Sequence, residues 1–455
     1  MRLPRAQKTK APAGSQMASK LLDWLSDLEQ RGPAPIALGL DRVAAVDRSL
    51  CAMRSPDAQS QPLVFMVAGT NGKGSTVCYI DSVLRAAGLR CGRFTSPHLI
   101  DYRERISING TDAEDAAIVG AFERIERARA DIDLTYFEFG TLAALELFRD
   151  AQLDAWVLEV GLGGRLDAVN IVNADIAVIT SIDIDHQQYL GGDREVIGLE
   201  KAGIMRSGCP VVLGDRQPPR SVIARAEQLQ APLLRSDQDF SIAEMDGSAA
   251  VLVWSAPDGN QYELPTPPLP GTHQRLNLAA AVTALWCARE RWPFAIGVLR
   301  DGIAAARLRG RLQRLPAHCA LYLDVAHNPD SARALADWLR SQAQSKRRII
   351  AVFALLVDKD LDGVLQPLLP LIDEWSLADM NGPRARTAAQ LQAHIETHVD
   401  ATCSTHADVG DALRFALERA READLVIAFG SFLVAEQVLK FAQRSADCTD
   451  EVHNR

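Results

Sequence analysis

Short apolar runs alternate along this chain with segments of helical spacing, and this alternation constrains the fold more than any other feature. The first series of runs comprises PLVFMVA (62–68), AWVLEV (155–160), IAVITSI (176–182) and PVVLG (210–214). Runs this short and this continuously apolar are typical of parallel strands buried on both faces. Between them, spacing of apolar residues predicts helices at 76–88, 140–150 and 195–205. The pattern therefore predicts an α/β doubly wound fold with a parallel-rich sheet.

A second alternation follows a boundary near residues 296–312. It predicts strands at 320–326, 348–356, 374–380 and 424–430, with helices between them. Before the boundary, a stretch rich in Pro, Ser and Asp predicts a small β-rich patch at 230–270, and a helix is expected at 276–290. With 455 residues, two or three domains are expected. We predict a flexible basic tail (1–17), a large domain (18–300) and a smaller α/β domain (301–455).

Charge and cysteine usage exclude several classes of protein. The net charge of −9 gives no general attraction to nucleic acid or an anionic membrane. No stretch is apolar enough over its length to span a bilayer, and no apolar segment of a secretory signal follows the basic start MRLPRAQKTK. A solvated tail is favoured there over a transit-like segment. The eight cysteines include no C-x-x-C pair, so we interpret the protein as cytoplasmic, in a reducing compartment.

VAGTNGKGST (67–76) joins a predicted strand to a predicted helix, where phosphate-binding loops occur. The common loop pattern would require glycine at position 67 and a hydroxyl at position 74, where this chain has Val67 and Gly74. Backbone N–H groups of a glycine-rich turn can still surround a phosphate, Lys73 adds a cation, and Ser75 or Thr76 could hold Mg²⁺. An ordinary turn with a surface lysine is disfavoured by three glycines and a lysine within six residues.

GTNGKGS (69–75) resembles the variant phosphate loop of the Mur ligase superfamily, in its folate branch. Further motifs carry the same resemblance in order over about residues 35–435. They are TSPHLIDYRERI (95–106), LTYFEFGTLAAL (134–145), LEVGLGGRLDAVN (158–170), TSIDIDHQQYLG (180–191), EKAGIM (200–205), HQRLNLAAA (273–281), DVAHNP (324–329) and DKD (358–360). The resemblance implies a Mur-ligase-like P-loop central domain and a smaller Rossmann-like α/β carboxyl-terminal domain.

The resemblance also implies an ATP-dependent amide ligase. ATP would phosphorylate a carboxylate, and the amino group of L-glutamate would displace phosphate from the acyl phosphate. The expected acceptors are 7,8-dihydropteroate, which gives dihydrofolate, and tetrahydrofolate, which receives further glutamates. A synthase that only extends the tail is the nearest alternative. A Mur-type ligase of cell-wall precursors and a non-catalytic nucleotide-binding protein are further alternatives, and they are disfavoured by TYFE, DVAHNP and the acidic and basic residues below.

Residue roles on the nucleotide side follow from the same resemblance. It implies ATP contacts from Thr70, Asn71, Gly72, Lys73, Gly74, Ser75, Asn277, Arg311 and Asp324, and catalytic roles for Lys73, Lys201 and His327. From the residues alone, Arg311 would serve equally well as a linker arginine in a surface ion pair. His327 and Lys359 would be ordinary loop residues, because Asn-Pro is itself a turn signal.

The resemblance implies two Mg²⁺ ions, with K⁺ as a further candidate, at Ser96, Glu159, His186 and Lys201. Glu159 ends an apolar strand, where a carboxylate is costly unless it faces a site, although a strand-end ion pair is an equal alternative. Imidazole is an unusual ligand for magnesium, so His186 depends on the resemblance. The resemblance also implies that Lys201 is carbamylated by CO₂, which requires a neutral amine. The alternative is a solvated helix lysine paired with Glu200.

TYFE (135–138) and LDA (166–168) resemble stretches of the family that bind dihydropteroate, so the resemblance implies that Thr135, Tyr136, Phe137, Glu138, Leu166, Asp167 and Ala168 contact the pteroate. An aromatic slot could stack a pterin ring, although core packing alone would explain the same aromatic residues. These two segments favour the bifunctional enzyme over the tail-extending one. Partners would be small molecules only (ATP, L-glutamate, dihydropteroate and tetrahydrofolate), without nucleic acid or membrane, and a monomer is favoured.

Overall fold

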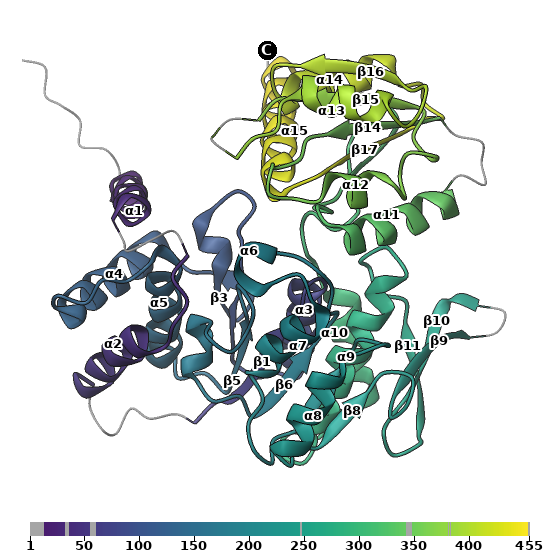
Figure 1. Ribbon diagram of the computed structural model, residues 1–455. Coiled ribbons are helices and arrows are strands. Elements are labelled where there is room, and N and C mark those ends of the chain that lie inside the picture. The colour runs from purple at the N-terminus through teal and green to yellow at the C-terminus, as the bar shows by residue number, and fades with distance from the viewer. Residues whose placement is uncertain are drawn as a thin grey trace, which may run out of the picture.

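The computed structural model describes residues 13–31, 36–54, 61–245, 248–342, 348–380, 382 and 384–453. Two α/β bodies, each built around its own sheet, lie one above the other (Figure 1). Residues 1–12 of the predicted tail lie outside the described residues, whereas residues 13–17 begin helix α1 (Ala13–Gln30).

The larger body contains an eight-stranded sheet with strand order β4-β3-β2-β5-β1-β6-β7-β8. Its strands are β1 (Leu63–Ala68), β2 (Cys91–Phe94), β3 (Ile106–Ile108), β4 (Thr111–Asp112), β5 (Ala155–Glu159), β6 (Ile176–Ile179), β7 (Val211–Leu213) and β8 (Leu233–Arg235). The six strands from β2 to β8 in this order are parallel, and β3 and β4 extend one edge antiparallel. Register pairs Val67 with Glu159, so the chain after β1 emerges beside the end of β5.

Helices cover both faces of this sheet. Successive side chains of β1 therefore point alternately into two hydrophobic cores, one on each face. Val64 and Met66 belong to the core under α1, α2 (Asp41–Ala52), α4 (Asp115–Arg129) and α5 (Tyr136–Asp150). Phe65 and Val67 belong to the other core, with α3 (Lys73–Ala86), α9 (His273–Cys287) and α10 (Ile296–Ala305). The remaining helical elements are η2 (Tyr102–Arg105), η3 (Ala168–Ile171), α6 (Gln187–Leu190), α7 (Arg194–Ala202) and α8 (Arg220–Gln228).

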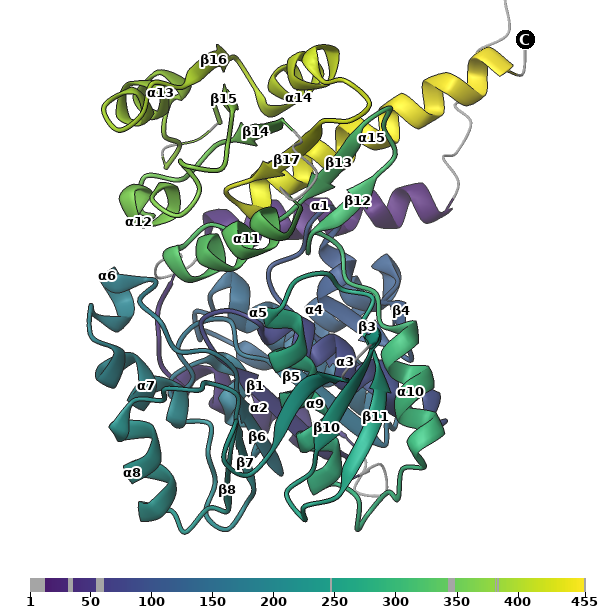
Figure 2. The ribbon, with the colours of Figure 1, turned by 90° about the vertical axis from the view of Figure 1, so that its right-hand side faces the viewer.

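A three-stranded antiparallel sheet confirms the predicted β-rich patch. It consists of β9 (Ser241–Met245), β10 (Ser248–Ser255) and β11 (Gln261–Pro265). Figure 2 views the molecule from the side of this sheet, with β10 and β11 in front. Trp254 is buried in the core that α9 shares, and its indole N–H lies 3.3 Å from the Thr283 hydroxyl. The sheet therefore supports the helix that carries Asn277.

The smaller body has strand order β12-β13-β17-β14-β15-β16. Its elements are β12 (Gln313–Leu315), β13 (Ala320–Leu323), α11 (Pro329–Gln342), β14 (Ile349–Phe353), α12 (Leu361–Leu365), β15 (Glu374–Ala378), α13 (Ala388–Glu396), β16 (Thr402–His406), α14 (Val409–Arg419), β17 (Leu425–Phe429) and α15 (Phe432–His453). β13 to β16 are parallel and only β12 is antiparallel. The predicted α/β fold, with a parallel-rich sheet in a larger domain and a smaller α/β domain after it, is confirmed.

The predicted boundary at residue 300 falls inside α10, and this helix packs on α3 of the larger body. The Ser82 hydroxyl donates to the Gly302 carbonyl at 2.7 Å, and a Cβ on Gly302 would lie 2.5 Å from Cα of Val83. Within the described part of the chain, no helix combines the length and apolarity needed to cross a lipid bilayer.

Candidate active site

A cavity of about 570 Å³ lies between the two bodies, at the carboxyl ends of β1, β5 and β6. Ligands of open α/β sheets bind at such strand ends. The larger body contributes the glycine loop and residues that follow β5 and β6, together with Lys201 and Asn277. The smaller body contributes residues around 324–335, 356–359 and 430–433. The cavity thus gathers groups that are up to several hundred positions apart in the sequence.

The glycine loop is held by the chain that leaves β6. The Thr70 N–H donates to the Ser181 carbonyl at 2.7 Å, and the Thr180 hydroxyl donates to the Asn71 carbonyl at 2.6 Å. Gly69 leaves no room for a side chain, because a Cβ there would lie 1.8 Å from the Thr180 hydroxyl oxygen. Loop and strand end therefore form one rigid edge of the cavity.

Gly72 precedes helix α3 in a left-handed conformation with φ of 86°. A Cβ there would lie 2.2 Å from Oδ1 of Asn277, so the glycine allows α9 to approach the loop. Gly74 is close to two charged groups, with Oε2 of Glu159 and a guanidinium nitrogen of Arg311 within 3.6 and 3.8 Å of where its Cβ would be. The sequence-predicted ATP contacts from both bodies thus meet at the start of one helix.

Lys73 turns back on its own loop. Its ammonium donates to the carbonyls of Gly69 and Thr70 at 3.0 and 3.1 Å. Burial lowers the pKa of Lys73, against the opposing charge of Glu159. These backbone carbonyls hold the ammonium at the cavity wall, where it can reach an anion.

Ser75 and Thr76 both bury hydroxyls that have no hydrogen-bond partner among the described residues. Ser75 lines the cavity and Thr76 does not. A buried hydroxyl without a partner costs free energy unless a ligand meets it. Of the two hydroxyls that the sequence left open for Mg²⁺, Ser75 therefore fits and Thr76 does not.

Glu159 is 5% exposed and accepts a hydrogen bond from the Ser96 N–H at 3.3 Å. Burial raises the pKa of its carboxyl, and the charges of Lys73 and Arg311 oppose this. No described residue makes an ion pair with Glu159, so the strand-end ion pair considered from the sequence is not formed. Glu159 and the unpartnered Ser75 hydroxyl line the same cavity, and oxygen ligands of this kind suit Mg²⁺.

Lys201 faces the cavity from α7 and is 3% exposed. Its expected alternative partner, Glu200, instead pairs with Arg165 at 2.8 Å. Among the described residues nothing donates to, accepts from or pairs with the Lys201 ammonium. Burial, together with the positive charge of Lys73, lowers the pKa of Lys201 to about 7. A large share of the side chain is therefore a neutral amine near neutral pH, which is the form that attacks CO₂.

Asp185 lines the cavity and joins the two bodies, and it was not predicted from the sequence as a site residue. Its carboxylate lies 2.6 Å from the Lys359 ammonium and accepts from Asn328 Nδ2 at 3.0 Å, and Nε2 of His327 is 3.6 Å away. Burial pushes the pKa of Asp185 upward, but the interactions with His327 and Lys359 outweigh it and hold this pKa far below its ordinary value. Asp185 is therefore an anion that positions two basic side chains.

His186 follows Asp185 and also lines the cavity, with a positive φ of 51°. Although the residue is exposed, the surrounding protein lowers the pKa of His186 to about 4, against the opposing charge of Asp185. The imidazole is neutral at physiological pH, as a metal ligand must be.

Asp324 holds the linker that carries Arg311. Its two carboxylate oxygens accept from the backbone N–H groups of Leu312 and Ala326, each at 2.8 Å. Burial lowers the pKa of Arg311, with Asp324 opposing, and the guanidinium lies 5.5 Å from the centre of the Phe432 ring. Arg311 therefore lines the cavity, and it forms no ion pair with any residue that the structure describes.

Asn71 forms a second polar link between the bodies. Its Nδ2 lies 3.0 Å from Oδ1 of Asn328 and 2.8 Å from a carboxylate oxygen of Asp330. Asn328 and Asp330 were not predicted as site residues. Both belong to or follow DVAHNP, but nothing in the sequence distinguishes a loop asparagine that bridges domains from one that closes a turn.

The segment 135–138 begins α5 and does not line the cavity. Thr135 and Glu138 form a reciprocal capping box, and Glu138 also pairs with Arg42 at 2.8 Å. Tyr136 packs edge-on against Tyr102 with ring centres 5.8 Å apart, and Phe137 packs on Phe94 at 5.9 Å. Structure thus gives each of these side chains a packing or capping contact of its own.

The segment 166–168 lies beside them. Asp167 is buried and accepts from the N–H groups of Leu162 and Val169, and burial raises the pKa of Asp167 to about 7. Leu166 accepts from the Gly39 N–H at 3.3 Å, and Ala168 is buried. A Cβ on Gly161 would lie 2.6 Å from Phe137 and 3.3 Å from Asp167. The two segments therefore meet at Gly161, which does line the cavity.

Comparison with known proteins places this arrangement in a family. Residues 67–285 match the Mur ligase middle domain, and residues 310–432 match the Mur ligase glutamate ligase domain. The dihydrofolate synthase/folylpolyglutamate synthase of Escherichia coli K12 is 41% identical over 425 residues, covering 93% of this chain and 96% of that protein. The folylpolyglutamate synthase of Lacticaseibacillus casei is 34% identical over 349 residues, covering 74% and 81%.

Solved structures agree. Escherichia coli FolC in complex with DHPP and ADP matches with a TM-score of 0.87 at 40% identity, covering 94% of this chain and 98% of that one. The bifunctional folylpolyglutamate synthase/dihydrofolate synthase of Yersinia pestis, complexed with AMPPNP and Mn, matches with a TM-score of 0.84 at 42% identity, covering 92% and 97%. These matches confirm the resemblance seen in the motifs.

Proposed function

Because this chain belongs to the dihydrofolate synthase/folylpolyglutamate synthase family of Mur ligases, we propose that it joins L-glutamate to 7,8-dihydropteroate and then to tetrahydrofolate. It is an ATP-dependent, ADP-forming ligase. The observation that supports the proposed reactions most strongly is the cavity between the bodies, in which the glycine loop, Glu159 and Lys201 face His327 and Lys359.

Activation of the acid comes first in the proposed sequence. A carboxylate oxygen of the folate substrate attacks the γ-phosphorus of ATP, the bond to the β-phosphate oxygen breaks, and ADP leaves. The loop N–H groups and Lys73 hold the phosphates, and Arg311 adds a cation from the other body. Ser75, Ser96, Glu159 and His186 are the residues that would hold Mg²⁺, and bound Mg²⁺ would neutralise charge on the phosphoryl oxygens.

Amide formation follows. The neutral amino nitrogen of glutamate attacks the acyl carbon, the bond from that carbon to the phosphate oxygen breaks, and the departing phosphate takes up the proton that the nitrogen loses. We assign glutamate to the wall formed by the smaller body. His327 donates through Nδ1 to the Val325 carbonyl at 2.7 Å, which fixes the ring and turns Nε2 toward Asp185. Such fixed groups position substrates without having to reorganise during the reaction.

We further propose that Lys201 is carbamylated. The support is its burial, its lack of a partner among the described residues and its pKa of about 7. Carbamylation would turn a buried cation into an anion able to bind a second metal ion. The test is ¹³C NMR after equilibration with ¹³CO₂. A carbamate resonance that persists in Lys201→Ala would contradict the assignment.

The second candidate is a synthase that only extends the glutamate tail, as the name of the Lacticaseibacillus casei relative describes. The bifunctional reading is favoured because the higher-identity relative is named for both activities and because segments 135–138 and 166–168 meet beside the cavity at Gly161.

One assay separates the candidates. Purified protein with ATP, Mg²⁺ and glutamate receives dihydropteroate or tetrahydrofolate in separate reactions, and ADP and amide products are measured. We expect product from both. Turnover with tetrahydrofolate alone would support the tail-extending enzyme, and no turnover with either substrate would refute the proposed reactions.

We also propose a monomer in the cytoplasm. The seven cysteines that the structure describes are all unpaired, as a reducing compartment would leave them. Size-exclusion chromatography with light scattering tests the assembly state, and a dimer at micromolar concentration would contradict it.

A further inference from the structure

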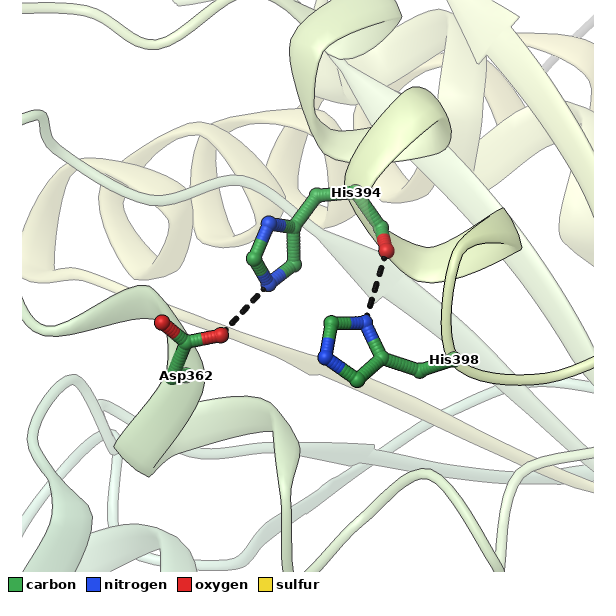
Figure 3. Close-up of side chains that lie close together, drawn as sticks. All are labelled: Asp362, His394 and His398. Carbon is green, nitrogen blue, oxygen red and sulfur yellow. Dashed lines mark hydrogen bonds and ion pairs between the residues drawn. The ribbon is translucent and has the colours of Figure 1, made fainter.

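Away from the cavity, the smaller body carries a cluster of one carboxylate and two imidazoles. Asp362 lies in the first turn of α12, His394 in the last turn of α13, and His398 just beyond that helix (Figure 3). One ligand atom of each lies within 4.8 Å of those of the other two. None of the three lines the cavity, and none has a place in the proposed reaction.

His394 presents a buried nitrogen that lacks a hydrogen bond. Its Nε2 is 2.8 Å from Oδ1 of Asp362, which is close enough for an ion pair. The same nitrogen nevertheless has no hydrogen-bond partner of acceptable geometry among the described residues. A buried polar atom left in this way is costly, and a cation placed between ring and carboxylate would satisfy both groups.

His398 is oriented by the backbone. Its Nδ1 lies 3.0 Å from the His394 carbonyl oxygen. A carbonyl only accepts, so Nδ1 carries the hydrogen and Nε2 keeps a lone pair. Figure 3 shows this second nitrogen on the side of the ring that faces Asp362 and His394. Metal-bound histidines are commonly fixed in this manner, with the other ring N–H donated to a carbonyl.

We propose that Asp362, His394 and His398 bind a divalent transition-metal ion, for which Zn²⁺ is the probe. Two imidazoles and one carboxylate suit Zn²⁺ and its neighbours in the first transition series, and they do not suit Mg²⁺. Tetrahedral ligand atoms around Zn²⁺ are roughly 3.3 Å apart, given bonds of about 2.0–2.1 Å. The Asp362 side chain is 74% exposed, so it can rotate to close the remaining gap.

The ion would bridge α12 to the end of α13 and leave a fourth position to water. α12 starts directly after DKD, with Asp360 as its cap, accepting from the Gly363 N–H at 3.0 Å. The bridge would therefore fix the segment that carries Lys359 into the cavity. It is a separate site from the one proposed for Mg²⁺, because its residues belong to the smaller body alone.

The test is calorimetric titration of the metal-free, full-length protein with Zn²⁺. Wild type is compared with His398→Gln and Asp362→Asn, and His318→Gln is the matched control, since it removes an exposed histidine of the same body. Binding of Zn²⁺ at Glu159 and His186 would be common to all four proteins and cancels in the comparison. We expect wild type and control to bind one more Zn²⁺ than the two cluster variants, or to bind it at least about tenfold more tightly. Identical titrations of all four proteins would overturn the proposal.

A second measurement does not depend on variants. In ¹⁵N-labelled wild type, addition of Zn²⁺ should shift the imidazole nitrogens of His394 and His398 and leave those of His318 unchanged. Unshifted His394 and His398 resonances at Zn²⁺ saturation of the protein would also overturn the proposal.

Discussion

Replacing Lys201 by methionine should stabilise the fold while abolishing the reaction. The side chain is 3% exposed, and burial, with the charge of Lys73, lowers its pKa from 10.5 to about 7. Methionine has a similar length and no charge to desolvate. The wild-type protein must be compared in CO₂-free buffer, so that the lysine is present as the free amine.

The magnitude follows from the shift. A pKa difference of about 3.5 corresponds to roughly 5 kcal/mol at about 1.36 kcal/mol per unit. Because the pKa is lower in the folded chain, unfolding takes up a proton between pH 7 and 10.5, and wild-type stability falls as the pH falls through this range. The destabilisation of the folded protein by Lys201 reaches its full value below pH 7. It is about 5 kcal/mol at pH 6 and about 2 kcal/mol at pH 9. The stability that the methionine variant gains over wild type should therefore be about 3 kcal/mol smaller at pH 9 than at pH 6.

Urea unfolding at both pH values measures this difference, followed by a probe in the larger body. Lys440→Met on α15 is the matched control, because that lysine is exposed and its loss should change stability by only about 0.5 kcal/mol or less at either pH. A Lys201→Met protein that is no more stable than wild type at pH 6, or whose advantage is equal at pH 6 and 9, would refute the reasoning.

Three further changes test the site. Gly72→Ala places a Cβ 2.2 Å from Asn277 at a positive φ, so the affinity for ATP, measured by calorimetry, should fall at least about tenfold. Gly88→Ala is the control, because Gly88 also has a positive φ but a Cβ there would have no described neighbour within 4 Å. It should cost about 1 kcal/mol of stability and leave ATP binding unchanged. Lys359→Met leaves Asp185 without its 2.6 Å partner, so kcat should drop by about two orders of magnitude. Adding Asp185→Asn to this variant should lower kcat little further, because the two residues act as a pair. Independent, additive losses of kcat would contradict the shared role. Thr135→Ala removes one half of the α5 capping box and should lower the free energy of unfolding by about 1 kcal/mol; an unchanged KM for dihydropteroate would assign this residue to helix capping and not to the substrate.

Buried strands and the loop between β1 and α3 could be predicted from the sequence because their signals are local. Continuous apolar runs marked β1, β5, β6, β14 and β17, and each lies within two or three residues of its predicted bounds. The edge strands β3 and β4 were missed. They are only three and two residues long, and β4 is exposed on both residues, so no apolar pattern marks them.

Candidate site residues could be predicted only where they lie in a motif of the family with an assigned role. Lys201 reads from sequence as a solvated helix lysine, and only tertiary packing shows that Glu200 pairs elsewhere and that the ammonium is buried. The role of Asp185 could not be predicted, because its partners, Lys359 and Asn328, are more than 140 positions away in the sequence. Helix capping by Thr135 and Glu138 was not predicted, although T-x-x-E before an apolar run is a sequence signature of a capping box; the same residues also fit the pteroate-binding stretch that the resemblance implies.

The amide of Asn71 has a consequence for how the protein responds to its nucleotide. A single side chain at the tip of the glycine loop is bonded to both Asn328 and Asp330 across the gap between the bodies. Phosphate affinity and the relative placement of the two bodies are then coupled quantities, and coupling is reciprocal. A solute or substitution that drives the bodies apart should therefore lower the affinity for ATP. The factor should equal the one by which bound ATP raises the equilibrium constant for bringing the bodies together.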